Sequence, residues 1–358
     1  MKVELNSQNI FNLNFHLFFE PVCCIKFMTK DSPQISGFLE IITGYQRSRV
    51  LFTLIELGVP TLLKSKKLSA GLLAKRLKIH PLAMERFLNA CVSINVLEKD
   101  DDKFFNSEFT EHYLIKNSEF YLGGIVKRHR KRSYAAWGNL TDALKNWRYG
   151  ETTSENPEDE DQGAEALAEQ HNLALLHGFE LAKAFDFTNF SRILDVGGGT
   201  GAMSIALCKS FPKLEATVFD LPENIKITED FVKKNKLNKR IKTVGGNFHK
   251  DNLPQNFDVV LLANFMAVAD AESNKKLLKQ IYDGLPSGGV CILSGWIIDD
   301  SHLAPQTSVL FCLEDICWNA PDVERSFKVY KSWLKEAGFK YIKSKNYLEP
   351  TRIIYGYK

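Results

Sequence analysis

The sequence has no long apolar run and no excess of charge of one sign. None of its apolar stretches approaches the ~20 residues of a membrane-spanning helix, so we predict no membrane segment. A net charge of +3 over 358 residues is too small to imply a nucleic-acid partner by itself. The seven cysteines are odd in number and lie mostly within apolar runs, which favours buried thiols in a reducing cytoplasm over a disulfide framework. These absences predict a soluble, cytoplasmic protein. Its 358 residues are enough for two domains.

The N-terminal part predicts a mainly helical domain over residues 28–150. Residues 1–27 precede it as an aromatic-rich extension, which we interpret as a misassigned start or an extra docking segment. Ser69 and Pro81 each begin a predicted helix, and a turn between two short strands follows, which is the winged-helix pattern. In the second of these helices, Arg86 is the main side chain that could bind DNA bases. We therefore predict that the domain serves packing or dimerisation and does not bind nucleic acid.

A basic run, KRHRKR, occupies residues 127–132. Helical spacing from Trp137 to Trp147 predicts an amphipathic helix after it. We interpret the run, His129 included, as a solvated surface, with binding of an acidic substrate or partner as the alternative. Residues 151–162 then predict an acidic connector.

From residue 163 to 358 the periodicity changes. Short apolar strands alternate with helices, which predicts an α/β fold with a doubly wound, mostly parallel sheet. The last segment, YIKSKNYL to TRIIYGYK, predicts a terminal antiparallel hairpin.

A glycine-rich loop, ILDVGGGTGA at residues 193–202, connects a strand to a helix and predicts a ligand site. Asp195 precedes the glycines, where its carboxylate can orient a cationic amino-acid ligand or hold the loop in place. Asp220 ends the next strand, where it can accept hydrogen bonds from both ribose hydroxyls. The string also satisfies GxGxxA, so NAD is an alternative ligand. Asn247 and Phe248, placed to bond and cover an adenine, favour an adenosyl ligand that carries an amino acid.

Five motifs follow one another in a family order: ILDVGGGTG, TVFDLP, VGGNF, LLKQIYDGLPSGGVCIL and Glu-Arg at 324–325. With them the chain resembles class I S-adenosylmethionine-dependent methyltransferases, specifically small-molecule O-methyltransferases of the plant phenolic and bacterial natural-product type. The resemblance implies a Rossmann-like sheet, a homodimer formed through the N-terminal domain, and a role in secondary metabolism. It also implies S-adenosylmethionine as cofactor, S-adenosylhomocysteine as product, a small aromatic or cyclic acceptor, and no metal.

The resemblance implies two sets of site residues. The cofactor set is Asp195, Gly197, Gly199, Gly201, Asp220, Leu221, Asn247, Phe248 and Ala263. The acceptor-pocket set is Phe265, Met266, Trp296, Glu314 and Trp318.

The catalytic loop lacks its acid–base residue. The family's loop reads His-Asp-Trp, and here Ala267 occupies the position of the histidine that deprotonates the acceptor. Gly295 occupies the position of an acid that orients it, so only Glu324 remains, with His171 as a possible substitute base. Because a carbon nucleophile can lose its proton after methyl transfer, we expect C-methylation or an acceptor that needs no base here.

Two other functions remain open. A cyclase or lyase would use the bound sulfonium without transferring a methyl group. A regulatory or binding protein would keep the site as a vestige.

Overall fold

The computed structural model describes residues 33–147, 163–317 and 325–358. The predicted extension at 1–27 and the predicted connector at 151–162 lie outside these ranges, as do Trp318 and Glu324.

The N-terminal part is a helical domain with a small wing. Its elements are α2 (Pro33–Glu56), α3 (Val59–Leu62), β1 (Leu68–Ser69), α4 (Ala70–Leu77), α5 (Pro81–Ser93), β2 (Leu97–Asp100), β3 (Lys103–Asn106) and α6 (Glu108–Tyr113). The three strands form one sheet in the order β1-β3-β2. The Ser69 hydroxyl accepts a hydrogen bond from the Leu72 amide and caps α4, while Pro81 begins α5, as the sequence predicted.

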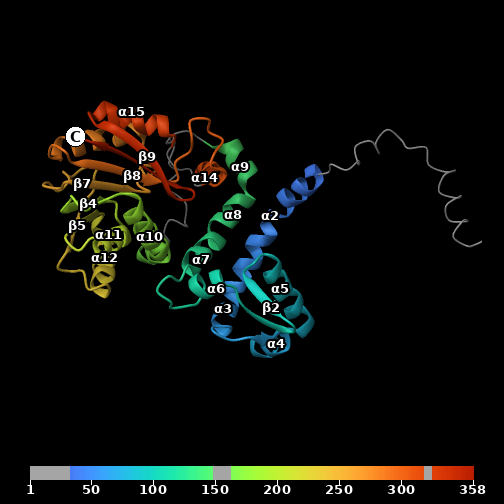
Figure 1. The fold of residues 1–358 in the computed structure, drawn as a ribbon. Coiled ribbons are helices and arrows are strands. Elements are labelled where there is room, and N and C mark those ends of the chain that lie inside the picture. Colours follow the sequence, from blue (N-terminus) through green and yellow to red (C-terminus); the bar gives the residue numbers. More distant parts are fainter. Residues whose placement is uncertain (1–32, 148–162, 318–324) are drawn as a thin grey trace, which may run out of the picture.

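Three short helices lead from this domain to the second one. They are α7 (Gly123–Lys131), α8 (Ser133–Gly138) and α9 (Leu140–Asn146). Figure 1 shows them running from the winged part to α14 (Gln306–Cys317). The single amphipathic helix predicted from Trp137 to Trp147 is wrong, because the chain breaks at Asn139, after a glycine that is a poor helix former.

The C-terminal part is a seven-stranded sheet. Its strands are β4 (Arg192–Val196), β5 (Glu215–Asp220), β6 (Ile241–Gly245), β7 (Val259–Ala263), β8 (Val290–Gly295), β9 (Lys340–Leu348) and β10 (Thr351–Tyr357). They follow the order β6-β5-β4-β7-β8-β10-β9. The first five are parallel, and β10 is antiparallel to both β8 and β9. The predicted mostly parallel sheet with a terminal hairpin is therefore confirmed.

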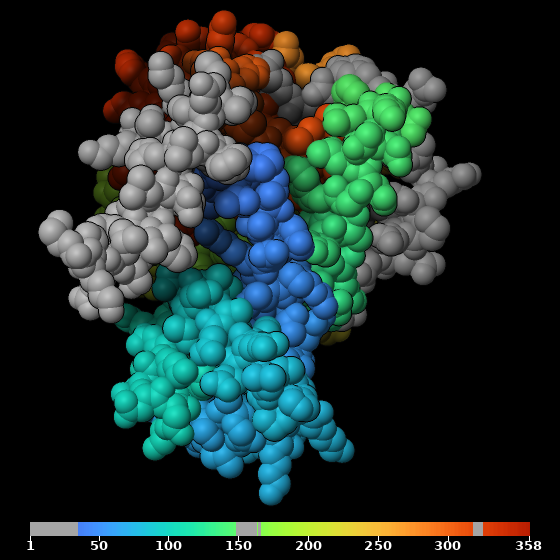
Figure 2. Space-filling model, turned by 90° about the vertical axis from the view of Figure 1, so that its right-hand side faces the viewer, coloured from blue at the N-terminus to red at the C-terminus, as the bar shows by residue number. Residues whose placement is uncertain are grey.

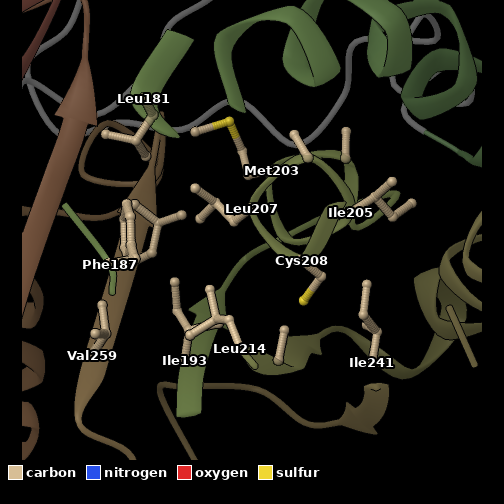
Figure 3. Close-up of a cluster of buried hydrophobic side chains, with 14 of the residues drawn as sticks. Leu181, Phe187, Ile193, Met203, Ile205, Leu207, Cys208, Leu214, Ile241 and Val259 are labelled. Carbon is tan, nitrogen blue, oxygen red and sulfur yellow. The ribbon is translucent and has the colours of Figure 1, made fainter. Parts of the chain in front are cut away.

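Helices cover both faces of this sheet. They are α10 (Ala164–Ala184), α11 (Ala202–Ser210), α12 (Pro222–Lys234), α13 (Ala271–Gly284) and α15 (Phe327–Ala337). Figure 3 shows one core layer, in which Leu181 of α10 and Leu207 of α11 face Ile193 and Val259 of the sheet. The other layer joins α13 and α15 to the opposite face through residues such as Leu278 and Trp333.

One surface of the N-terminal domain is apolar. Helix α2, blue in Figure 2, lies at the surface beside α7–α9 in green. Its exposed side chains include Ile35, Phe38, Leu39, Ile41, Ile42 and Tyr45. Among the described helices, none has the length and apolar character needed to cross a membrane.

We expect Leu181→Ala to destabilise the chain by about 2–5 kcal/mol, because it opens a cavity in the fully buried layer of Figure 3. Urea unfolding at fixed protein concentration measures the change. Leu303→Ala is the control, since Leu303 is 79% exposed and should cost less than about 0.5 kcal/mol. Equal losses in both variants would contradict this description of the core.

Candidate functional site

A cavity of about 630 Å³ opens at the carboxyl ends of the parallel strands. It lies where the strand order reverses, with β5 and β7 on opposite sides of β4, which is the place where open α/β sheets bind ligands. Its walls come from the glycine loop, the loop after β7, the end of β8, and helices α7, α8, α10 and α14.

The glycine loop follows β4 and needs its glycines. Gly197, Gly199 and Gly201 have φ angles of +68°, +54° and +71°, which are strained for other residues. A side chain at Gly197 would also collide with the Phe265 ring, because a Cβ there would lie 2.1 Å from a ring carbon. The loop therefore presents bare backbone to the cavity.

Asp195, the last charged residue of β4, is fully buried beneath this loop. The Ser204 hydroxyl donates to its Oδ2 at 2.7 Å, while Oδ1 has no hydrogen-bond partner among the described residues. Burial raises the pKa of Asp195 to about 6, against the Ser204 hydrogen bond and with a smaller contribution from Asp220. Since Asp195 also lines the cavity, Oδ1 is an acceptor that a cationic group of a ligand would satisfy.

Asp220, at the end of β5, holds the glycine loop in place. Its Oδ2 accepts the Gly199 amide at 2.7 Å, and its Oδ1 accepts the Leu221 amide and the Asn224 side chain at 2.8 and 2.7 Å. Asn247 Oδ1 accepts the His249 amide at 2.9 Å. These carboxylate and amide oxygens keep further lone pairs for a ligand.

The structure brings together part of the predicted cofactor set. Asp195, Gly197, Gly199 and Ala263 line the cavity. The residues that do not line it are Gly201, Asp220, Leu221, Asn247 and Phe248. Phe248 packs instead against Phe265, with ring centroids 5.0 Å apart, and thereby adjoins Gly197.

The predicted acceptor set divides in the same way. Met266, Trp296 and Glu314 line the cavity, whereas Phe265 is buried outside its lining. Trp296 meets Phe311 edge to face at 4.7 Å, which gives this wall an aromatic surface.

Ala267 lies in the cavity wall within the loop after β7. The Asn274 side chain fixes this loop by donating to the carbonyls of Met266 and Ala269 at 2.8 and 3.0 Å. The loop is thus held at a fixed position and offers the cavity no acid or base at residue 267.

His171 lies on α10 and also lines the cavity. Its Nδ1 is 2.7 Å from the Thr200 hydroxyl, and its ring stacks on Phe231 at 3.7 Å. Burial, with Lys234 and Lys209 nearby, lowers the pKa of His171 to about 4. The imidazole is therefore neutral near pH 7 and is bonded to the glycine loop.

Two cavity histidines escaped the sequence analysis. His129, assigned there to the surface, is partly buried and lines the cavity, as do Arg128 and Arg132 of the same basic run. His177 lines it from α10, and burial lowers its pKa to about 4. The spacing of His177 from Gln170 and Ala174 on one helical face is the signal that predicts its place.

Two other residues that the sequence analysis missed, Ser133 and Tyr347, also line the cavity. Ser133 donates to Glu314 at 2.7 Å, and Tyr347 bonds Ser294 at 2.7 Å. In the described parts of the chain, no group of three or more His, Cys, Asp or Glu is placed to hold a metal ion.

Comparison with known proteins gives two family matches. A model described as an O-methyltransferase domain matches residues 137–340, and one described as an O-methyltransferase dimerisation domain matches residues 39–116. The chain is 29% identical to the N,N-dimethyltransferase OxyT of Streptomyces rimosus, over 86% of this chain and 91% of that one. It is 29% identical to 3-hydroxy-5-methyl-1-naphthoate 3-O-methyltransferase of Streptomyces sahachiroi, over 87% and 91%. The solved structure of human N-acetylserotonin methyltransferase in complex with SAM has a similar fold, with a TM-score of 0.80 and 24% identity over 92% of this chain and 99% of that one.

Asp195 generates a pH prediction for the ligand-free chain. Its folded pKa of about 6 lies above its ordinary value of 3.8, so the folded state binds this proton more tightly than the unfolded state. The resulting stabilisation is present below about pH 4 and is lost as the pH rises through about 6, a change of about 3 kcal/mol. Asp195→Asn should remove this loss, so the variant should gain stability over the native chain between about pH 4 and about pH 7.

Urea unfolding across this pH range measures the effect, with Asp142→Asn on exposed α9 as the control. An equal pH dependence in the native chain and in Asp195→Asn would contradict the burial of a charge at Asp195.

Proposed function

Because the chain belongs to the O-methyltransferase family, we propose that it transfers methyl groups from S-adenosylmethionine to a small cyclic or aromatic acceptor, at a carbon or at another atom that needs no base at residue 267. The observation that carries the proposal is Ala267 in the cavity wall, within a loop whose position Asn274 fixes.

The site fits the cofactor at its amino-acid end. The buried and unpartnered Asp195 Oδ1 suits a cationic α-amino group, and the bare backbone from Gly197 to Gly199 suits a close approach. Asp220 would hold the ribose, and Asn247 and Phe248 would hold the adenine. When bound, the cofactor supplies a methyl group attached to a positively charged sulfur. The sulfur leaves readily because it departs as a neutral thioether.

The missing histidine limits which acceptors react well. A general base is worth ~10²–10⁴-fold when a neutral hydroxyl must lose its proton as it attacks. An enol or an electron-rich ring attacks through carbon. It loses its proton from another atom, or after the methyl group has been transferred. Positioning and exclusion of water then supply most of the rate.

The cavity wall supports a ring-shaped acceptor. Trp296 presents an indole supported by Phe311, and Met266 adds a polarisable apolar surface. A flat ring would bury its faces against these side chains.

His171 suits a positioning role better than a catalytic one. Its Nδ1 bonds Thr200 within the glycine loop, so the ring holds the loop and α10 together. A direct proton-transfer role for His171, like one for Glu324, stays a prediction.

We extend the proposal to assembly and location. The match to a dimerisation domain and the exposed apolar face of α2, including Ile41 and Phe38, support a homodimer formed through the N-terminal domain. The free buried thiols of Cys91, Cys208 and Cys291 support a cytoplasmic location.

The proposal predicts a specific product. 1,3-Dihydroxynaphthalene offers both oxygen and electron-rich carbon to the same methyl donor. We expect incubation with S-adenosylmethionine to give S-adenosylhomocysteine and a C-methylated ring, identified by NMR. Asp195→Asn should bind S-adenosylhomocysteine at least ~10-fold more weakly in calorimetry, because it loses a charge-assisted hydrogen bond.

N-acetylserotonin serves as the comparison acceptor, since it offers a neutral phenol. Exclusive O-methylation of both acceptors at similar rates would contradict the proposal. Turnover without S-adenosylhomocysteine would instead indicate the cyclase or lyase function.

A further inference from the structure

A hydrogen-bonded chain of three polar side chains lies in a different cavity wall from Ala267. His129 of α7, Ser133 of α8 and Glu314 of α14 all line the cavity. His129 Nδ1 is 3.1 Å from Ser133 Oγ, and Ser133 Oγ is 2.7 Å from Glu314 Oε1. The other carboxylate oxygen, Oε2, accepts the Trp137 indole N–H at 2.8 Å.

The direction of these hydrogen bonds fixes the histidine tautomer. The Glu314 carboxylate only accepts, so Ser133 must use its single proton to donate to Oε1. Ser133 Oγ can then only accept from His129, which places the imidazole proton on Nδ1. Nε2 of His129 therefore carries a lone pair and is able to take up a proton.

We propose that His129 is the catalytic base of this enzyme, with Ser133 and Glu314 as positioning residues that set its tautomer and stabilise its protonated form. The inference rests on the proposed function and adds to it the group that receives the acceptor's proton. In a Ser-His-Asp triad the histidine lies between the nucleophilic hydroxyl and the acid. Here the Ser133 hydroxyl lies between the histidine and the acid, so it connects the two and is not a nucleophile.

A base in a wall apart from Ala267 suits C-methylation. In O-methylation one oxygen both attacks the methyl group and loses its proton, so base and methyl donor must meet at that atom. In an enol or phenol that reacts through carbon, the hydroxyl lies on the atom next to the attacking carbon. The base can then act at a separate point of the cavity.

The step balances without a further reactant. The enol carbon forms a bond to the methyl carbon, the sulfur–methyl bond breaks, and its electron pair stays on sulfur. The enol O–H proton passes to His129 Nε2, leaving a carbonyl group and an imidazolium, which returns the proton to solvent.

The charges around His129 suit this role. Burial and Arg128 lower the pKa of His129, whereas Glu314 raises it. The imidazole is therefore neutral near pH 7, and the carboxylate stabilises it once protonated. Arg132, Asp315 and Arg325 also line the cavity, and the last two form an ion pair at 2.6 Å.

The three residues join distant parts of the chain. Ser133 and Glu314 are 181 positions apart, and their hydrogen bond attaches α8 to α14. Lys127 and Arg130 fix α7 through ion pairs with Glu169 and Glu56. The base therefore forms only when the linking helices contact the sheet domain.

The test measures the tautomer first. In protein with nitrogen-15-labelled histidine, long-range proton–nitrogen correlation should show a histidine with its proton on Nδ1, and this signal should vanish in His129→Gln. Glu314→Gln should invert the tautomer, because its amide can donate to Ser133 and so turn the Ser133 hydroxyl toward His129. A proton on Nε2 of His129 in the native protein would overturn the proposal, whatever the enzyme methylates.

Kinetics with 1,3-dihydroxynaphthalene supply the second readout. His129→Gln should lower kcat at least ~10²-fold with little change in KM, and Glu314→Gln should lower it less. His80→Gln, exposed at the start of α5, is the matched control and should match the native rate.

Calorimetry with S-adenosylhomocysteine separates the two claims. Binding by native protein and His129→Gln alike, with a native kcat in His129→Gln, would overturn the base while leaving the methyltransferase intact. Absence of binding in both would instead contradict the proposed function.

Discussion

The site depends on one buried carboxylate at the reversal point of the sheet. Asp195 lies at the end of β4 with Oδ2 bonded to Ser204 and Oδ1 without a protein partner among the described residues. Burial disfavours the ionised form of this carboxyl group and therefore raises the pKa of Asp195. In the proposed function, a cationic group of the cofactor would offset this cost by bonding Asp195 Oδ1, which has no partner among the described residues. The glycine loop above it, fixed through Asp220 to Gly199, leaves that ligand room.

The histidines that line the cavity lie apart from the loop that carries Ala267. His129 is on α7, and His171 and His177 are on α10. His171 is bonded to the glycine loop, whereas His129 is connected through Ser133 to Glu314. Methyl donor and base would therefore act on the acceptor from different walls. Under the proposed function, that separation would let a carbon nucleophile react although Ala267 carries no base.

Local sequence patterns predicted those elements of the fold whose geometry depends on residues close to one another in the sequence. The alternation of strands and helices predicted the sheet. The glycine turn predicted the loop between β4 and α11, because the strand, loop and helix form one continuous segment. Asp195, which the sequence placed at the end of a strand before the glycines, lines the cavity for the same reason. The place of His129 could not be predicted, because six basic or imidazole side chains in succession resemble a solvated face. Its connection through Ser133 leads to Glu314, which lies 181 positions further along the chain. The break at Asn139 separates α8 from α9, and both helices contact α14, a segment far away in the sequence.

The most direct test of the central claim is a crystal structure of the chain with S-adenosylhomocysteine. The account predicts that the α-amino group of the ligand lies within hydrogen-bonding distance of Asp195 Oδ1, beneath the backbone of Gly197 and Gly199. It predicts in addition that Ala267 faces the sulfur across open space. A ligand whose amino group contacts other residues and leaves Asp195 Oδ1 without a partner would contradict the account.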